Sequence, residues 1–264
     1  MLSALLSIPE RIGARARSFV RSLGQFGRFA GQMSVLLPRS FVRPRLIIDQ
    51  IHFIGNYSLL IILVSGLFVG FVLGLQGYYT LQRYGAEQAL GLLVALSLVR
   101  ELGPVVSALL FAGRAGTSLT AEIGLMKAGE QLSAMEMMAV DPMARVVVPR
   151  FIGGVVSMPL LAALFSAVGI FGGYIVGVWL IGVDSGAFWS QMQGGVDVRS
   201  DVLNGIIKSV VFGLVVNTIA LYYGYKCVPT PEGVARATTR TVVTASLAVL
   251  GMDFLLTALM FGGR

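Results

Sequence analysis

Residues 93–111, LVALSLVRELGPVVSALLF, decide the fold class of this chain. The stretch is apolar except that Arg100 and Glu101 stand side by side near its middle. A helix of roughly 20 apolar residues is long enough to cross the hydrocarbon core of a bilayer. We therefore predict a transmembrane helix here, and the two opposite charges inside it require an explanation.

The composition of the whole chain supports a membrane protein. Of its 264 residues 56% are hydrophobic and 12% are charged, and the mean hydropathy is +0.82. Soluble domains carry about 25% charged residues. Apolar runs of sufficient length predict five spans, which lie within residues 47–81, 88–112, 151–181, 203–225 and 242–261. We predict an all-α integral membrane protein whose transmembrane domain covers residues 47–264.

Residues 1–46 form a separate, arginine-rich segment. Within residues 11–30, apolar side chains recur at helical spacing and share one face: Ile12, Ala16, Phe19, Leu23, Phe26 and Ala30. Arg17, Arg21 and Arg28 lie on the opposite face. This pattern predicts an amphipathic helix in the membrane surface, with its arginines toward anionic head groups. A helix packed on a protein partner would have the same pattern, so both interpretations stay open.

Basic residues are distributed unequally between the two ends of the predicted spans. Fifteen Lys and Arg residues fall in residues 1–45, 113–150 and 224–240. The other side has three, which are Arg83, Arg199 and Arg264. Cytoplasmic loops collect basic residues, so the N-terminus is predicted in the cytoplasm and the C-terminus outside. The net charge of +7 therefore reflects topology, and we expect no nucleic-acid partner.

Two ladders of glycine occur with a spacing of four residues. The first predicted span contains Gly66, Gly70 and Gly74, and the third contains Gly169, Gly173 and Gly177. Small residues at this spacing let another helix approach the backbone closely. Packing within the chain accounts for at least one ladder, and the other is a candidate contact between two copies.

The sequence has no motif for catalysis or nucleotide binding. It contains neither GxxxxGK[ST] nor HExxH, and His52 and Cys227 are its only histidine and cysteine. One histidine and one cysteine cannot make a zinc site alone. We predict no catalytic residue, metal or cofactor on this chain, so energy for any transport would come from another chain or an ion gradient.

The charges inside the spans are the strongest functional signal. A charge at the centre of a transmembrane helix costs roughly 2.5–3.5 kcal/mol on insertion scales. Neighbouring helical residues point about 100° apart, so Arg100 and Glu101 are poor partners for each other. We predict that Asp253 pairs with Lys208 or Arg100. The network of Arg100, Glu101, Lys208 and Asp253 either holds helices in register or faces a polar cavity that binds an amphipathic molecule.

Residues 113–150, GRAGTSLTAEIGLMKAGEQLSAMEMMAVDPMARVVVPR, are too polar for the bilayer core. They predict one or two short helices that end at Asp141-Pro142. This segment includes an adaptable apolar surface that suits docking to another protein, formed by Met126, Met135, Met137 and Met138. A helix lying on the membrane surface is the alternative.

Two blocks of this sequence also resemble a known family. Residues 100–142, RELGPVVSALLFAGRAGTSLTAEIGLMKAGEQLSAMEMMAVDP, and residues 229–262, PTPEGVARATTRTVVTASLAVLGMDFLLTALMFG, are similar to the MlaE-type permeases. These permeases are the membrane subunits of ABC transporters that move phospholipid between the two membranes of Gram-negative bacteria. The resemblance extends from about residue 47 to the end, whereas the N-terminal segment matches in character rather than in motif.

The resemblance implies an assembly in the bacterial inner membrane that moves glycerophospholipid and so maintains outer-membrane lipid asymmetry. Two copies of the permease would form the core, and each would dock a cytoplasmic ATPase through residues 113–150. The ATPase would bind ATP and Mg, with a small STAS-domain subunit beside it. A hexameric MCE-domain subunit would sit on the periplasmic side.

The resemblance also implies site residues. The outward-facing lipid cavity between the two copies would be lined by Leu73, Gln76, Thr80, Leu81, Tyr84, Arg100, Glu101 and Leu102. The ATPase contacts would be Glu122, Lys127, Glu130, Glu136 and Asp141. Two other classes of function remain as alternatives: a proton-coupled secondary transporter that uses Glu101 and Asp253, and a scaffold that only anchors partners.

Overall fold

The computed structural model describes residues 2–40 and 44–261, and among the first 40 residues it describes only the side chains of residues 17 and 20–38. The N-terminal helix, α1, covers Leu2–Ser40. Five further segments are long and apolar enough to cross a membrane: Pro44–Gln82, Glu87–Ala128, Met143–Leu180, Val198–Lys226 and Pro231–Met260. The predicted number of spans is confirmed, and every regular element in the described residues is a helix.

Most spans are divided by short 3-10 or π-helical turns. The first span is α2, Pro44–Gln82, and the fifth is α10, Pro231–Phe261. The second contains η1 Glu87–Ala89, α3 Leu90–Leu96, η2 Ser97–Leu102, α4 Gly103–Phe111, η3 Ala112–Gly116 and α5 Thr117–Ala128. The third contains η4 Met143–Val147, α7 Val148–Tyr174 and η5 Ile175–Leu180, and the fourth contains η6 Val198–Val202 and α9 Leu203–Lys226. Two short helices lie between spans, α6 Gln131–Met137 and α8 Ser185–Gly195.

The second span is longer than its sequence predicts. Through η3, α5 continues the span as far as Ala128, although the sequence turns polar at residue 113. The reason is packing against α9 and α10. The Thr120 hydroxyl is buried and lies 2.9 Å from both the Ala220 carbonyl oxygen and the Thr241 hydroxyl. Tertiary contacts therefore extend the helix, and α6 is the separate short helix before Asp141-Pro142.

The fifth span begins eleven residues before the predicted position 242, at Pro231. The side chain of Thr230 accepts a hydrogen bond from the Gly233 N–H at 3.1 Å, as an N-cap residue does. Proline is favoured at the first helical position because the N–H it lacks would be unpaired there. Arg236 and Arg240 come before the apolar run in the sequence, which is why the span was predicted to begin after them. The helix nevertheless includes both arginines.

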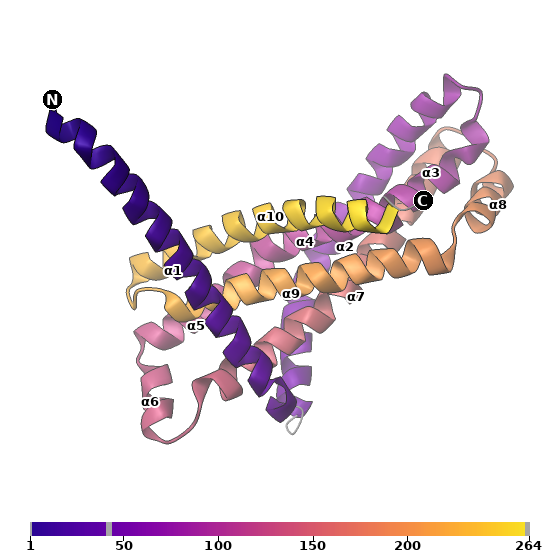
Figure 1. Ribbon diagram of the computed structural model, residues 1–264. Coiled ribbons are helices and arrows are strands. Elements are labelled where there is room, and N and C mark those ends of the chain that lie inside the picture. Colours follow the sequence, from indigo (N-terminus) through magenta and orange to yellow (C-terminus); the bar gives the residue numbers. More distant parts are fainter. Residues whose placement is uncertain (1, 41–43, 262–264) are drawn as a thin grey trace.

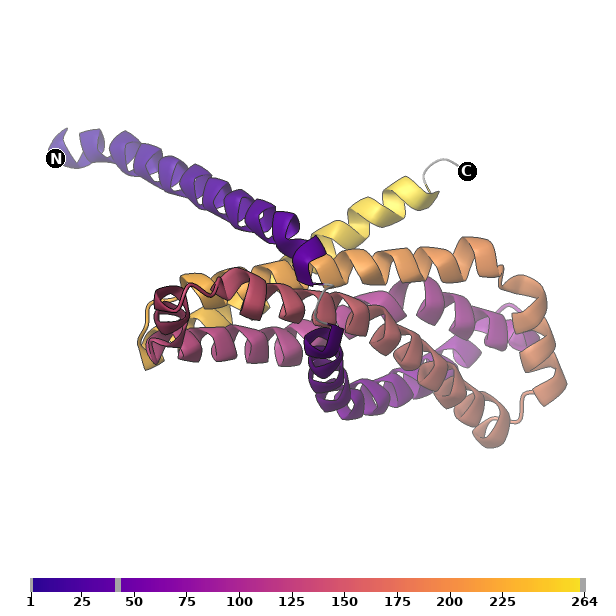
Figure 2. The same ribbon diagram turned by 90° about the horizontal axis from the view of Figure 1, so that it is seen from below.

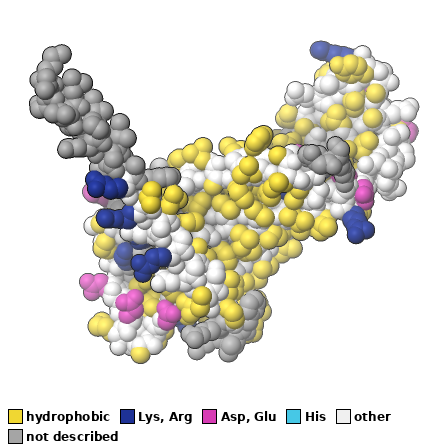
Figure 3. All heavy atoms as spheres, viewed as in Figure 1, with side chains coloured by type: hydrophobic (Ala, Val, Ile, Leu, Met, Phe, Trp, Pro, Cys, Tyr) yellow, Lys and Arg dark blue, Asp and Glu magenta, His cyan; other side chains and the backbone are white. Residues whose placement is uncertain are grey.

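The helices form an elongated bundle with distinct ends. In Figure 1, α9 and α10 lie side by side and α2 crosses behind them close to α7. One end carries α6 and the turn at residues 227–230, and we call it the basic end. The opposite end carries α8 and the turn at residues 83–86 (Figure 1). Figure 3 shows apolar side chains across the middle of this face and charged side chains near its ends, as expected for a membrane-spanning bundle.

The two glycine ladders both lie in close helix contacts within the chain. A Cβ atom on Gly70 would lie 2.0 Å from the Gly169 carbonyl oxygen, and one on Gly74 would lie 3.0 Å from the Gly173 carbonyl oxygen. The backbones therefore touch with no space for side chains. The expectation that one ladder could serve a contact between copies is wrong, because both ladders are covered within the chain. The α2 ladder packs on the backbone of α7, and Cβ atoms on Gly169, Gly173 and Gly177 would meet Leu98, Val94 and Leu90 of the second span.

The C-terminal half of α1 packs on the basic end of the bundle. Phe29 and Met33 are buried, and the ring centroids of Phe26 and Phe29 lie 5.2 Å and 5.7 Å from that of Tyr222 on α9. These side chains hold α1 against its own chain, while Figure 2 shows its N-terminal half projecting from the bundle. The side chains of Ile12, Ala16 and Phe19, and residue Arg264, lie outside the described residues, so the interfacial role of α1 stays a prediction.

Candidate functional site

The Arg100-Glu101 pair lies in the π-helical turn η2. The Gly103 N–H donates to the Leu98 carbonyl, five residues earlier, instead of to residue 99. Pro104 explains the change, because it has no N–H for the Arg100 carbonyl and its ring would crowd that carbonyl. The wider turn redirects the two charged side chains toward different partners. Such turns occur frequently at functional sites.

Arg100 forms an ion pair with Asp201 of η6. Its Nε and Nη2 atoms both donate to Asp201 Oδ1, and the Nε–Oδ1 distance is 2.7 Å. The second carboxylate oxygen, Oδ2, accepts the Asp197 N–H at 2.9 Å. The Asp201 side chain is 1% exposed, whereas that of Arg100 is 31% exposed. The carboxylate is thus fixed from several sides, while part of the guanidinium remains accessible.

Lys208 of α9 is the centre of a second cluster. Its Nζ donates to Glu101 Oε2 at 2.5 Å, to Asp253 Oδ1 at 3.0 Å and to the Thr257 hydroxyl at 2.7 Å. All three N–H groups of the ammonium therefore have an acceptor. The Lys208 side chain is 0% exposed. The predicted pairing of Asp253 with Lys208 is confirmed, whereas Arg100 pairs with Asp201 instead of Asp253.

The two clusters join three spans through their charges. Glu101 and Arg100 come from the second span, Asp201 and Lys208 from the fourth, and Asp253 from the fifth. Buried ion pairs of this kind fix helix register, because separating the partners leaves an uncompensated charge in a low-dielectric interior. The Glu101 side chain is nevertheless 38% exposed. Glu101 and Arg100 can therefore meet a polar group from outside the chain.

The cluster is not arranged to hold a metal ion. The Lys208 ammonium occupies the position between the Glu101 and Asp253 carboxylates where a cation would bind. In the described part of the chain, no group of three or more His, Cys, Asp or Glu side chains is placed to share a metal. The arrangement is suited to electrostatic binding of a polar or charged group.

The Asp201→Asn variant is expected to lower the free energy of unfolding by about 1–3 kcal/mol. The amide keeps the shape of the carboxylate but removes the charge that offsets Arg100, and Arg100 is partly solvated, so the loss is moderate. Thermal unfolding of the purified chain in detergent measures this loss. Asp49→Asn, at an exposed position on α2, is the matched control and should unfold as the unaltered chain does. Equal unfolding temperatures for both variants would contradict the role of Asp201.

Sequence reasoning missed Asp201 and Thr257. The predicted fourth span begins at residue 203, which leaves Asp201 in the loop before it. In the structure, residues 198–202 already form the π-helical start of that span. The predicted network of Arg100, Glu101, Lys208 and Asp253 already balances, with two charges of each sign, so charge counting gives no signal for Asp201.

The predicted cavity residues fall into two groups. Leu73, Leu81 and Leu102 are half-buried and pack against the main apolar core. Gln76, Thr80 and Tyr84 are exposed at the opposite end of α2 and in the turn after it. Within one chain, these residues do not surround Glu101, whose carboxylate points to α9. Their assignment to a shared cavity stays a prediction that requires a second copy.

The predicted ATPase-contacting residues also divide into two groups. Glu122 pairs with Arg150 at 3.2 Å, and the Lys127 Nζ donates to the carbonyl oxygens of Tyr225 and Cys227 at 2.9 Å and 3.0 Å. These two side chains thus brace the basic end of the bundle. Glu130, Glu136 and Asp141 are exposed on or beside α6, and Met137 on the same helix is 84% exposed. α6 presents the accessible surface of the segment.

Comparison with known proteins gives the family. Residues 47–259 match the model of the family described as Permease MlaE. The chain is similar to the intermembrane phospholipid transport system permease protein MlaE of Haemophilus influenzae, with 59% identity over 98% of this chain and 99% of that protein. A probable ABC transporter permease of Rickettsia felis is 38% identical over 97% of this chain and 99% of its own length. The chloroplastic protein TRIGALACTOSYLDIACYLGLYCEROL 1 of Arabidopsis thaliana is 27% identical over 89% of this chain and 67% of its length. This chain is a member of the MlaE permease family.

Proposed function

We propose that this chain is the permease subunit of an ABC transporter that moves glycerophospholipid between the inner and outer membranes. Its relative from Haemophilus influenzae is named as an intermembrane phospholipid transport permease, and the match covers nearly the whole of both chains. The inner membrane is the proposed location, with the basic end in the cytoplasm. The excess of Lys and Arg at that end supports this orientation.

The observation that carries the proposal is the exposure of charge inside the second span. Arg100 and Glu101 remain 31% and 38% exposed although each has an ionic partner. Exposure to hydrocarbon at this depth is costly, so a polar cavity must lie beside them. A phospholipid needs such a cavity, because its phosphate can pair with a guanidinium while its acyl chains contact apolar walls.

A second copy of the chain is proposed to close this cavity. The C-terminal half of α10 stands away from the other helices (Figure 2), and Phe254 on it is 72% exposed. Asp253 lies beside Phe254 on the same helix, so the apolar surface adjoins the charged cluster. A homodimer would cover both at once. The exposed residues Gln76, Thr80 and Tyr84 would then complete the cavity wall.

The partner ATPase is proposed to dock on α6. The exposed methionines of α6 form an adaptable apolar surface with acidic residues at its edge. This chain has no phosphate-binding loop in its sequence, so ATP and Mg would bind to the ATPase. A small STAS-domain subunit beside the ATPase and a hexameric MCE-domain subunit at the opposite end complete the proposed complex, in keeping with the family resemblance.

The double variant Met137→Asp, Met138→Asp should weaken ATPase binding by at least tenfold. The two aspartates replace the exposed apolar centre of α6 and add charge beside Glu136, and desolvation of a central charge is unfavourable at an interface. Co-purification of the ATPase with the tagged permease measures the effect. Val198→Asp, which alters an apolar residue of similar exposure at the opposite end, is the control. Unchanged ATPase recovery with the α6 variant would exclude this docking surface.

Lipid transfer by the reconstituted complex tests the proposed function. Proteoliposomes with the full complex should move labelled phospholipid to acceptor vesicles when ATP is supplied, and lipid should stimulate ATP hydrolysis. The alternative, a secondary transporter in which Glu101 and Asp253 relay protons, predicts transfer driven by a proton gradient without ATP. Gradient-driven transfer that is indifferent to ATP would overturn the proposal.

A further inference from the structure

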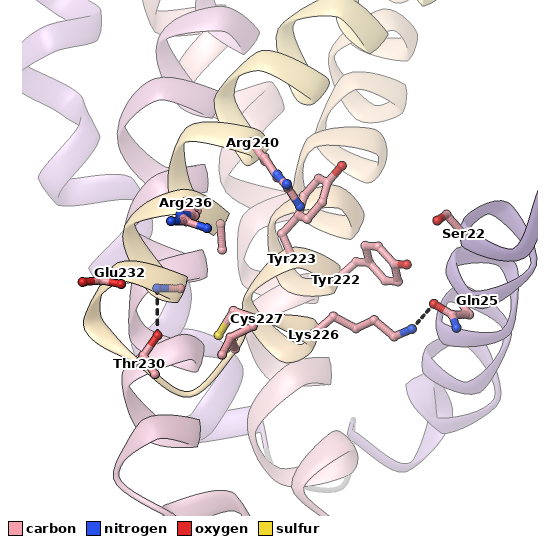
Figure 4. A pocket seen from close by; sticks show the side chains of 13 residues that line it. Ser22, Gln25, Tyr222, Tyr223, Lys226, Cys227, Thr230, Glu232, Arg236 and Arg240 are labelled. Atoms are coloured by element: carbon pink, nitrogen blue, oxygen red, sulfur yellow. Dashed lines mark hydrogen bonds between the residues drawn. The ribbon is translucent and has the colours of Figure 1, made fainter. Parts of the chain in front are cut away.

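A polar cleft lies at the basic end, away from the intramembrane charges. It has a volume of about 620 Å³ and is formed by α1, the last turn of α9, the turn at residues 227–230 and the first three turns of α10. Figure 4 shows Lys226 reaching from α9 to α1, where it donates to Gln25 Oε1. Tyr222 and Tyr223 lie on α9 above it in the view of Figure 4. The cleft is large enough for a head group.

Three cations line this cleft, namely Lys226, Arg236 and Arg240. Arg236 and Arg240 are four residues apart on α10, so they share one helix face about 6 Å apart along the axis. Glu232 is the one acidic residue in the wall, which leaves an excess of two positive charges. In the part of the chain whose side chains are described, neither arginine has a hydrogen bond or an ion pair.

The position of the cleft relative to the membrane limits the kind of anion that can bind there. Arg240 lies within the fifth span, two residues before the apolar run that begins at residue 242, whereas Lys226 lies at the end of the fourth span. An anion there would sit at the boundary between head groups and hydrocarbon. Basic pockets between helices at this level of a membrane bind lipid phosphates. The rings of Tyr222 and Tyr223 supply apolar surface beside the cations, as the glycerol end of a lipid requires.

We propose that this cleft binds the phosphate of an anionic phospholipid, which bridges α1 and α10. The lipid would belong to the leaflet at the basic end and would be a bound structural lipid, separate from any lipid in transit beside Arg100. The bidentate guanidinium groups of Arg236 and Arg240 would hold the phosphate oxygens, and Lys226 would add a third cation. The acyl chains would extend from the cleft into the adjacent membrane.

Titration of the full chain in detergent with phosphatidylglycerol tests this site. Ligand binding raises the unfolding temperature, so the unaltered chain should be stabilised by phosphatidylglycerol more than by phosphatidylcholine. Arg236→Gln with Arg240→Gln should raise the apparent Kd for phosphatidylglycerol by roughly tenfold or more, since each lost guanidinium removes charge-assisted hydrogen bonds. Arg83→Gln with Arg199→Gln makes the same change in charge at the opposite end and should leave the Kd unchanged.

Further arms separate the possible explanations. Arg236→Lys with Arg240→Lys keeps the charge but loses the bidentate geometry, so its Kd should lie between those of the unaltered chain and the glutamine variant, and it serves if the glutamine variant does not fold. Equal stabilisation by phosphatidylglycerol of the unaltered chain and the Arg236, Arg240 glutamine variant would overturn the site. Stabilisation by inorganic phosphate alone, lost in that variant, would assign the cleft to free phosphate and overturn the lipid. Loss of ATPase recovery with an unchanged lipid Kd would identify a protein contact instead.

Discussion

Lys208→Met is expected to abolish lipid transport and to lower the free energy of unfolding by roughly 3–5 kcal/mol. Lys208 is fully buried and its ammonium lies between two carboxylates, at 2.5 Å from Glu101 and 3.0 Å from Asp253. Methionine fills a similar volume but leaves both carboxylates facing each other without a cation. One of them must then take up a proton or move apart, and either response disturbs the contact between three spans.

The Lys208 prediction can be checked by thermal unfolding together with ATP-driven lipid transfer. Arg199→Met, which removes an exposed cation at the start of the same span, should behave as the unaltered chain in both measurements. Exchange of the charges, Lys208→Asp with Asp253→Lys, should recover transport that each single reversal loses, because the ammonium returns to the same cluster. Near-normal stability of Lys208→Met would show that the cluster does not hold the spans together.

Gly70→Ala is expected to have an effect of similar size through packing alone. Its Cβ would lie 2.0 Å from the Gly169 carbonyl oxygen and 2.8 Å from the Gly169 carbonyl carbon. Backbone atoms cannot rotate away as a side chain can, so α2 and α7 must separate. Inserting one methyl group into a tight core costs about 1–3 kcal/mol, and a clash with backbone falls at or above the upper limit.

Gly251→Ala is the matched control for Gly70→Ala. Gly251 also lies inside a long transmembrane helix, but nothing approaches within 4 Å of the position of its Cβ. Alanine is the better helix former, so this variant should be as stable as the unaltered chain or slightly more stable. Thermal unfolding and the yield of folded protein in detergent compare the two. Equal behaviour of the two variants would contradict the close α2–α7 contact.

The spans were predictable because hydrophobic length is a local property. Crossing a bilayer needs roughly 20 apolar residues, and each of the five runs meets this requirement in the sequence. That Asp253 pairs with Lys208 or Arg100 was predictable for a related reason, since a charge inside a span needs an opposite charge within reach. Neither inference requires knowledge of which helices are neighbours.

The remaining contacts depend on that neighbour relation, which a single sequence does not contain. The spacing of Gly66, Gly70 and Gly74 indicates a close helix contact but cannot identify α7 as the partner. The partner of Arg100 was missed because Asp201 enters the membrane through a π-helical turn, which hydropathy does not indicate. The extension of α5 beyond residue 113 was missed because its packing on α9 outweighs its polarity.

The most direct test of the central claim is a structure of the assembled complex with the lipid that co-purifies with it. The account predicts two copies of this chain around a cavity and a phospholipid whose polar head lies within hydrogen-bonding distance, about 3 Å, of Arg100 or Glu101. A cavity without any amphiphile, together with a Glu101 side chain sealed between helices, would contradict it and leave the charged clusters with a purely structural role.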